Sequence, residues 1–153
     1  MAGLRSAQGY VDGFSQRSGI EVSLHLPAKL RRFHREVEIT LFRAVLEGLT
    51  NIHRHSQASE ANISLVIDAK EIHLEIGDNG KGIPKEQLRD MAEQGSETGV
   101  GLSGMRERVR DLGGALTIYS DSSGTLVKVS IPVLDSAQKA AKGRSLKRVS
   151  ANG

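Results

Sequence analysis

The sequence predicts a two-layer α/β sandwich of the α+β class, in which a mixed, mostly antiparallel sheet is covered on one face by helices. Alternating apolar and polar residues mark two pairs of strands, and a short turn joins the members of each pair. Strands joined by such short turns pair antiparallel. Only two long stretches have helical periodicity, and two helices can cover one face of such a sheet.

Five segments have the two-residue period of half-buried strands. In the first, Ile20, Val22, Leu24 and Leu26 alternate with polar residues before Pro27. The short turns at residues 68–70 and 121–124 indicate two hairpins. The expected strands are residues 20–26, 61–67, 71–76, 115–120 and 125–132.

A long helix is expected over residues 36–55. At about 100° per residue its large apolar side chains fall on one face, which we expect to pack on the sheet. These side chains are Phe42, Val45, Leu46, Leu49 and Ile52. Glu47, Asn51 and His55 follow one another at intervals of four residues and fall on the opposite side of the helix.

A second helix is expected over residues 102–112. Leu102, Met105, Val109 and Leu112 repeat at helical spacing before the Gly113-Gly114 stop. The preceding residues 92–98 are polar and without periodicity, which indicates a loop. Near the N-terminus a few apolar residues could line a further short helix.

The domain organisation follows from length and composition. The chain has 153 residues and no cysteine, which excludes a disulfide scaffold, a thiolate zinc site and a cysteine nucleophile. We expect a linker or the end of a preceding helical region at residues 1–19, one domain at 20–134 and a basic, disordered tail at 135–153. No apolar run approaches the roughly 20 residues of a membrane helix, so a cytoplasmic domain without direct membrane contact is expected.

The formal net charge of +3 resides in the tail. From Asp135 onward the tail has five Lys or Arg residues and one acidic residue, so the rest of the chain is slightly acidic. Aromatic residues make up only 3% of the chain, which gives little for nucleic-acid bases to stack on. We therefore expect no nucleic-acid partner.

Gly99, Gly101 and Gly104 match the G-x-G-x-x-G pattern of dinucleotide-binding folds. That fingerprint requires a buried strand immediately before the glycines, whereas residues 90–98 are polar. A dehydrogenase is therefore disfavoured. Glycines at a helix start still let backbone amides approach a phosphate, although a simple glycine-rich hinge fits this segment equally well.

Two further segments carry candidate ligand groups. Glu47, Asn51 and His55, with Arg54 adjacent, could hold a hydrated magnesium ion and phosphate oxygens, or could form an ordinary solvated helix face. Asp78 stands at a strand end before a glycine turn, where a carboxylate can accept an N–H group from a base edge. An ordinary Asp-Asn-Gly turn is the alternative.

Four segments, in this order, resemble the ATP-binding domain of the GHKL superfamily. LFRAVLEGLTNIHRH resembles its N box, GDNGKGIP its G1 box, GVGLSGMRERV its G2 box, and GTLVKVSIP its closing strand. The sequences of these motifs are most similar to those of sensor histidine kinases paired with LuxR-type response regulators. The resemblance covers roughly residues 20–133 and implies a Bergerat-type ATP-binding fold.

The resemblance also implies roles for individual residues. Asn51 would be the magnesium ligand and, with Glu47, a catalytic residue. Asp78 would accept the adenine amino group, and Thr125 would join it in a water-bridged contact to the base. Residues 92–98 would form a lid over ATP. The other implied ATP-binding residues are Arg54, His55, Gly80, Gly82, Ile83, Gly99, Val100, Gly101, Leu102 and Gly104.

The chain departs from the family pattern at two points. Gly48 stands where alanine is common, and none of the five histidines lies in a phosphoacceptor motif. The resemblance thus implies the catalytic domain of a histidine protein kinase, which positions Mg2+ and ATP for γ-phosphate transfer to a histidine of a separate dimerisation domain, with a response regulator as a further partner. A superfamily protein-serine kinase or ATPase, or a non-catalytic nucleotide-sensing module, are the alternatives.

Overall fold

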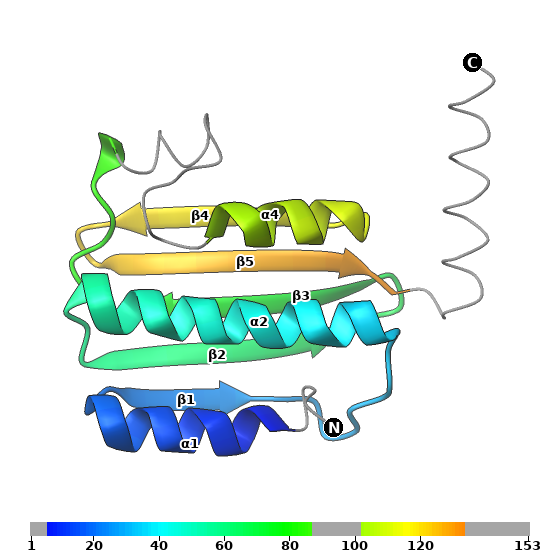
Figure 1. Ribbon diagram of the computed structural model, residues 1–153, viewed down its shortest axis with the longest axis horizontal. Coiled ribbons are helices and arrows are strands. Elements are labelled where there is room, and N and C mark those ends of the chain that lie inside the picture. Colours follow the sequence, from blue (N-terminus) through cyan, green and yellow to red (C-terminus); the bar gives the residue numbers. More distant parts are fainter. Residues whose placement is uncertain (1–5, 87–101, 134–153) are drawn as a thin grey trace.

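The computed structural model describes residues 6–86 and 102–133, which form a layer of helices on a sheet of strands (Figure 1). The expected lid (92–98), the glycine-rich residues Gly99, Val100 and Gly101, and the basic tail lie outside the described residues. The elements are α1 (Ala7–Ser18), β1 (Glu21–His25), α2 (Arg35–Asn51), η2 (Ile52–Ser56), β2 (Glu60–Ile67), β3 (Glu71–Asp78), α4 (Leu102–Asp111), β4 (Ala115–Asp121) and β5 (Gly124–Pro132).

The strands form one five-stranded sheet in the order β1-β2-β3-β5-β4. Strand β1 pairs parallel with β2, and the other three pairs are antiparallel. The predicted fold class and both predicted hairpins are confirmed. In the β2–β3 turn the Asp68 carboxylate accepts hydrogen bonds from the N–H groups of Lys70 and Glu71, each at 2.7 Å.

Helices α1, α2 and α4 all lie on the same face of the sheet (Figure 1). The core fills the space between the two layers, because the buried side chains of β2 and β3 alternate with exposed or half-buried ones. Helix α1 belongs to this packed layer, since Val11 and Phe14 are buried in the core. The segment expected as a linker or the end of a helical region is therefore a packed helix over its described part.

The buried stripe of α2 differs from the one expected from its large apolar residues. The residues buried there are Val37, Thr40, Leu41, Ala44, Val45, Gly48 and Leu49. Phe42 and Leu46 are only half-buried, contrary to the prediction. The reason is that the buried stripe runs through the small residues Ala44 and Gly48, which a search for large apolar side chains overlooks.

The long helix ends in one turn of π-helix, η2. The hydroxyl of Ser56 donates a hydrogen bond to the carbonyl of Ile52 at 2.6 Å, and Gln57 then takes the left-handed conformation with φ 56°. A π turn within a long helix is frequent at functional sites. Within the described ranges, residues 6–86 and 102–133, no helix combines the length and the apolar character needed to cross a membrane.

Candidate nucleotide-binding site

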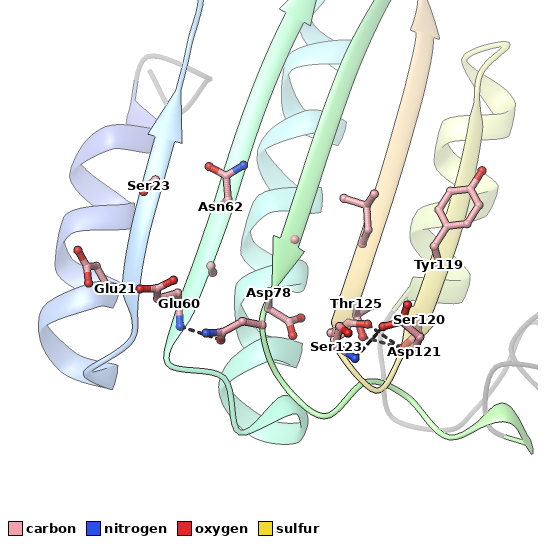
Figure 2. A pocket seen from close by; sticks show the side chains of 15 residues that line it. Glu21, Ser23, Glu60, Asn62, Asp78, Tyr119, Ser120, Asp121, Ser123 and Thr125 are labelled. Atoms are coloured by element: carbon pink, nitrogen blue, oxygen red, sulfur yellow. Dashed lines mark hydrogen bonds between the residues drawn. The ribbon is translucent and has the colours of Figure 1, made fainter.

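Three segments distant in sequence meet at one end of the sheet: the end of α2 with η2, the end of β3 and the start of β5. Asp78 is the last residue of β3 and pairs directly with Thr125, the second residue of β5. Directly paired residues share a face of the sheet, so both side chains lie on the helix-covered side. Figure 2 shows Asp78 and Thr125 together at this end. Their expected position at strand ends is confirmed.

A cavity of about 170 Å³ lies at this end between α2 and the sheet. It is smaller than the roughly 300–1,000 Å³ of pockets that enclose a whole drug-sized ligand, so it fits only part of a nucleotide, such as the base. Its walls combine apolar side chains with polar groups. The lining residues are Gly48, Asn51, Ile52, His55, Ser56, Ile76, Asp78, Lys81, Ile83, Pro84, Thr125 and Val127.

Gly48 sets the distance between α2 and strand β3 in this cavity. A Cβ atom at Gly48 would lie 2.9 Å from Cδ1 and 3.1 Å from Cγ2 of Ile76, both tighter than ordinary contacts. The missing side chain therefore lets the helix backbone approach the apolar wall. The departure from alanine at this position has a packing reason that helix propensity does not reveal.

Asn51 enters the cavity rather than pointing away from the sheet side of the helix, so the predicted orientation of its face is wrong. The buried stripe runs through Gly48, and Asn51 stands three residues further on, at the border of that stripe. Its Nδ2 atom is buried and has no hydrogen-bond partner. Buried polar atoms are nearly always paired, so this amide indicates a ligand group in the cavity.

Asp78 provides the carboxylate of the cavity. The Gly80 N–H group donates a hydrogen bond to its Oδ1 at 2.8 Å. Burial raises the pKa of Asp78 above its usual value, and hydrogen bonds from the backbone of Gly80 and Thr125 oppose this rise. This half-buried carboxylate accepts hydrogen bonds from backbone groups, and it can accept a further one from a ligand in the cavity.

The raised pKa of Asp78 predicts a pH-dependent stability of the ligand-free chain. Because the folded protein takes up this proton at a higher pH than the unfolded chain, the contribution to the free energy of unfolding is fully present below the usual pKa of 3.8 and is lost as the pH rises through the raised pKa. Urea unfolding of the wild type and of Asp78→Asn over a pH series measures it. Wild type should lose stability relative to the variant as pH rises; a constant difference would contradict the shift.

The glycine turn after β3 packs tightly on neighbouring backbone. A Cβ at Gly80 would collide with the carbonyl of Ser56, and one at Gly82, whose φ is +81°, would collide with the carbonyl of Asp121. The N–H group of Lys81 donates a hydrogen bond to the Ser56 carbonyl at 2.8 Å. Gly80 and Gly82 therefore do not line the cavity but hold this turn against η2 and β4.

The structure does not bring every predicted site residue into the cavity. His55, Ile83 and Thr125 line it, whereas Glu47 and Arg54 do not, and Arg54 is exposed. Leu102 begins α4, and Gly104 lies on the exposed side of that helix. The glycine-rich residues 99–101 are outside the described part of the chain.

Among the cavity residues that sequence reasoning did not assign to the site are two polar ones, Ser56 and Lys81. Both directly adjoin residues that were predicted, since Ser56 follows His55 and Lys81 stands between Gly80 and Gly82. Adjacency to those motifs was a signal that could have found them. Ser120, which bonds two site residues, had no such signal.

A larger hollow of about 590 Å³ lies at the same strand ends but spreads over the face without helices (Figure 2). Its rim carries the carboxylates of Glu21, Glu60 and Asp121, and Asp78 also borders it. Several like charges would repel a triphosphate. The smaller cavity beside Asn51 is therefore the better candidate for a nucleotide.

Within the described residues, no group of three His, Cys, Asp or Glu side chains is arranged to hold a metal ion. The Asn51 side chain fits a different arrangement, in which its amide oxygen would join water and phosphate oxygens around Mg2+, while its unpartnered Nδ2 can only donate a hydrogen bond. Magnesium usually keeps several waters and binds through few protein ligands together with substrate phosphates.

Curated relatives of the chain are sensor kinases. The signal transduction histidine-protein kinase/phosphatase DegS of Brevibacillus brevis is 36% identical over 125 residues, which cover 81% of this chain and 31% of the relative. The oxygen sensor histidine kinase NreB of Staphylococcus carnosus is 31% identical over 129 residues, covering 84% and 35%. The chain thus spans about a third of the length of these relatives.

A solved structure has the same fold. The histidine kinase domain of a blue-light activated histidine kinase from Erythrobacter litoralis superposes with a TM-score of 0.68 at 24% identity, covering 90% of this chain and 64% of that chain. The family model for histidine kinase-, DNA gyrase B- and HSP90-like ATPases matches residues 36–135, which include all four motifs. The chain therefore belongs to this ATPase family, and its resemblance to the ATP-binding domain of a sensor histidine kinase is confirmed.

Proposed function

We propose that this domain binds ATP with its adenine in the cavity beside Asn51 and positions the γ-phosphate for transfer to a histidine on a separate dimerisation domain. The observation that carries the proposal is that one cavity is lined by a hydrogen-bond acceptor and by an unpartnered donor. The Asp78 carboxylate can accept a hydrogen bond, and the buried Asn51 Nδ2 has no partner. Apolar Ile76, Ile83 and Val127 provide surfaces for a flat base.

The phosphates would leave the cavity on the side of Asn51 and His55. These residues lie at the end of the long helix, and neither lines the larger hollow with its carboxylates. The Asn51 amide would hold Mg2+ together with phosphate oxygens, and the bound ion would neutralise the charge that develops during phosphoryl transfer. Glu47 lies one turn before Asn51 and would act on the same group only through water.

The test of the magnesium role is Asn51→Ala. Without the amide, the Mg2+-dependent part of ATP affinity is expected to fall about tenfold, the size of one lost ligand bond. Calorimetric titration of ATP with and without Mg2+ measures this. Asn62→Ala is the matched control, because Asn62 is exposed on β2 and lines the other hollow. Equal effects of the two variants would show that ATP does not use this cavity.

Transfer to histidine is tested with the dimerisation domain of the same parent kinase. Given γ-labelled ATP, the mixture should form an acid-labile phosphohistidine on the dimerisation domain, while the chain alone stays unlabelled. Acid-stable label on serine would favour a protein-serine kinase, and free phosphate an ATPase. ATP binding without transfer would favour a nucleotide-sensing module.

Under this proposal the chain is part of a longer sensor kinase that acts in the cytoplasm. Its partners would be the dimerisation and phosphoacceptor domain and a response regulator of the LuxR type. The two curated relatives described above are named as signalling histidine kinases, which supports this placement.

A further inference from the structure

Ser120 stands behind the cavity and bonds two of its walls. It lies in β4 directly opposite Thr125. Its Oγ is 2.6 Å from the Ile83 nitrogen, 2.9 Å from Oγ1 of Thr125 and 3.4 Å from the Gly124 carbonyl. Figure 2 shows Ser120 and Thr125 side by side at this end of the sheet. The site described above gives Ser120 no role.

Counting protons fixes the direction of one of these bonds, and the distances favour a direction for the others. The Ile83 N–H group can only donate, so the Ser120 oxygen accepts that bond. Ser120 then has one proton to give, and it has two candidate acceptors. Hydrogen bonds between hydroxyl and oxygen span about 2.5–3.0 Å, which favours Thr125 at 2.9 Å over the Gly124 carbonyl at 3.4 Å.

With Ser120 as the donor in its 2.9 Å contact with Thr125, in which either hydroxyl could donate, Thr125 accepts this bond and keeps its own proton for the cavity. Asp78, directly opposite Thr125 in the sheet, is an acceptor when ionised. The cavity thus offers an acceptor, Asp78, beside a donor, Thr125, and the bond from Ser120 keeps Thr125 in the donor role. Without Ser120 the Thr125 hydroxyl could turn and act as either donor or acceptor.

We propose that Ser120 is a positioning residue for base selection, which holds the Thr125 hydroxyl as a donor so that the site prefers adenine over a 6-oxopurine. The proposal rests on ATP binding in this cavity. Adenine has a donor at its 6-amino group beside an unprotonated N1. Hypoxanthine has an acceptor at O6 beside an N1–H donor, so it reverses both groups.

Thr125 has the same role as a donor if a water lies between it and adenine. A water that donates one proton to the Asp78 carboxylate and the other to N1 of adenine has no proton left. It must accept a bond from Thr125, which the Ser120 contact leaves free to donate. With hypoxanthine the water would accept a bond from the N1–H group instead of donating one to N1, so the order of the bonds at the base would change.

The test compares the dissociation constants of ATP and inosine triphosphate by calorimetry on the full chain. In Ser120→Ala the ratio of the inosine triphosphate constant to the ATP constant is expected to fall about three- to tenfold, which corresponds to one misdirected hydrogen bond. Ser122→Ala, in the exposed turn of the same hairpin, is the matched control and should leave the ratio unchanged.

A second background separates base selection from a merely structural role, because Ser120 also anchors Ile83. In Thr125→Val the ratio should already be low, and adding Ser120→Ala should not change it further. If Ser120→Ala instead weakens both nucleotides equally, with or without the Thr125 hydroxyl, Ser120 only anchors Ile83 and the proposal is overturned.

The same titrations distinguish this inference from the proposed function. If the wild type binds ATP and Ser120→Ala leaves the ratio unchanged, the inference about Ser120 fails while ATP binding stands. If the folded wild type binds neither nucleotide, the proposed function fails and the inference fails with it.

Discussion

Replacing Asp78 with asparagine is expected to weaken ATP binding by about 10- to 100-fold while the chain stays folded, because a hydrogen bond to a charged acceptor is lost. The amide oxygen can still accept the bond from the Gly80 N–H group, which holds the carboxylate now. The amide nitrogen would then face the adenine amino group, so two donors would meet where a donor met an acceptor.

Calorimetric titration with ATP measures this loss, and circular dichroism checks the fold of the variant. Asp111→Asn removes the same charge from an exposed position at the end of α4 and is the matched control. If Asp78→Asn binds ATP as tightly as Asp111→Asn, the base does not contact Asp78, and the assignment of the adenine end of the cavity is wrong.

Replacing Gly124 with alanine is expected to lower the free energy of unfolding by on the order of 3 kcal/mol, since backbone strain and overpacking each cost a few kcal/mol or less. Gly124 has φ +139°, and a Cβ atom there would collide with the carbonyl of Asp78. To relieve the collision, the start of β5 would have to move away from the end of β3, where Asp78 and Thr125 pair.

Urea unfolding measures the change in stability, and ATP titration of the remaining folded protein should show weaker binding. Gly9→Ala is the control. Gly9 lies within α1, and a Cβ atom added to it meets nothing within 4 Å. That variant should be unchanged or more stable by up to about 1 kcal/mol. A Gly124→Ala protein as stable as Gly9→Ala would contradict the close approach of β3 and β5.

Local patterns in the sequence were sufficient to predict the strands and both hairpins. Alternation and short turns are properties of neighbouring residues, so they can be read without knowing the fold. The strand order could not be predicted in this way. Strand β5 pairs with β3, although α4 and β4 separate them in the sequence, and β4 lies at the edge of the sheet. The packing of α1 was also missed, since it depends on contacts of Val11 and Phe14 with distant residues.

Residues of the candidate site that belong to sequence motifs could be predicted. Residues that join the site only because their strand lies beside another could not. Asp78 was found from its strand end, Asn51 from the spacing of polar residues on its helix, and Thr125 only through the family resemblance. The orientation of Asn51 was wrong because the packed face of α2 is centred on small residues that apolar counts ignore. Ser120 is an ordinary serine in a strand, and only the β4–β5 register places it beside Thr125.

The most direct test of the account is calorimetric titration of the 153-residue chain with ATP in the presence and absence of Mg2+. We expect one ATP per chain, tighter binding with Mg2+, and loss of that gain in Asn51→Ala. A correctly folded chain that shows no heat of ATP binding under either condition would contradict the assignment of this cavity as a nucleotide site.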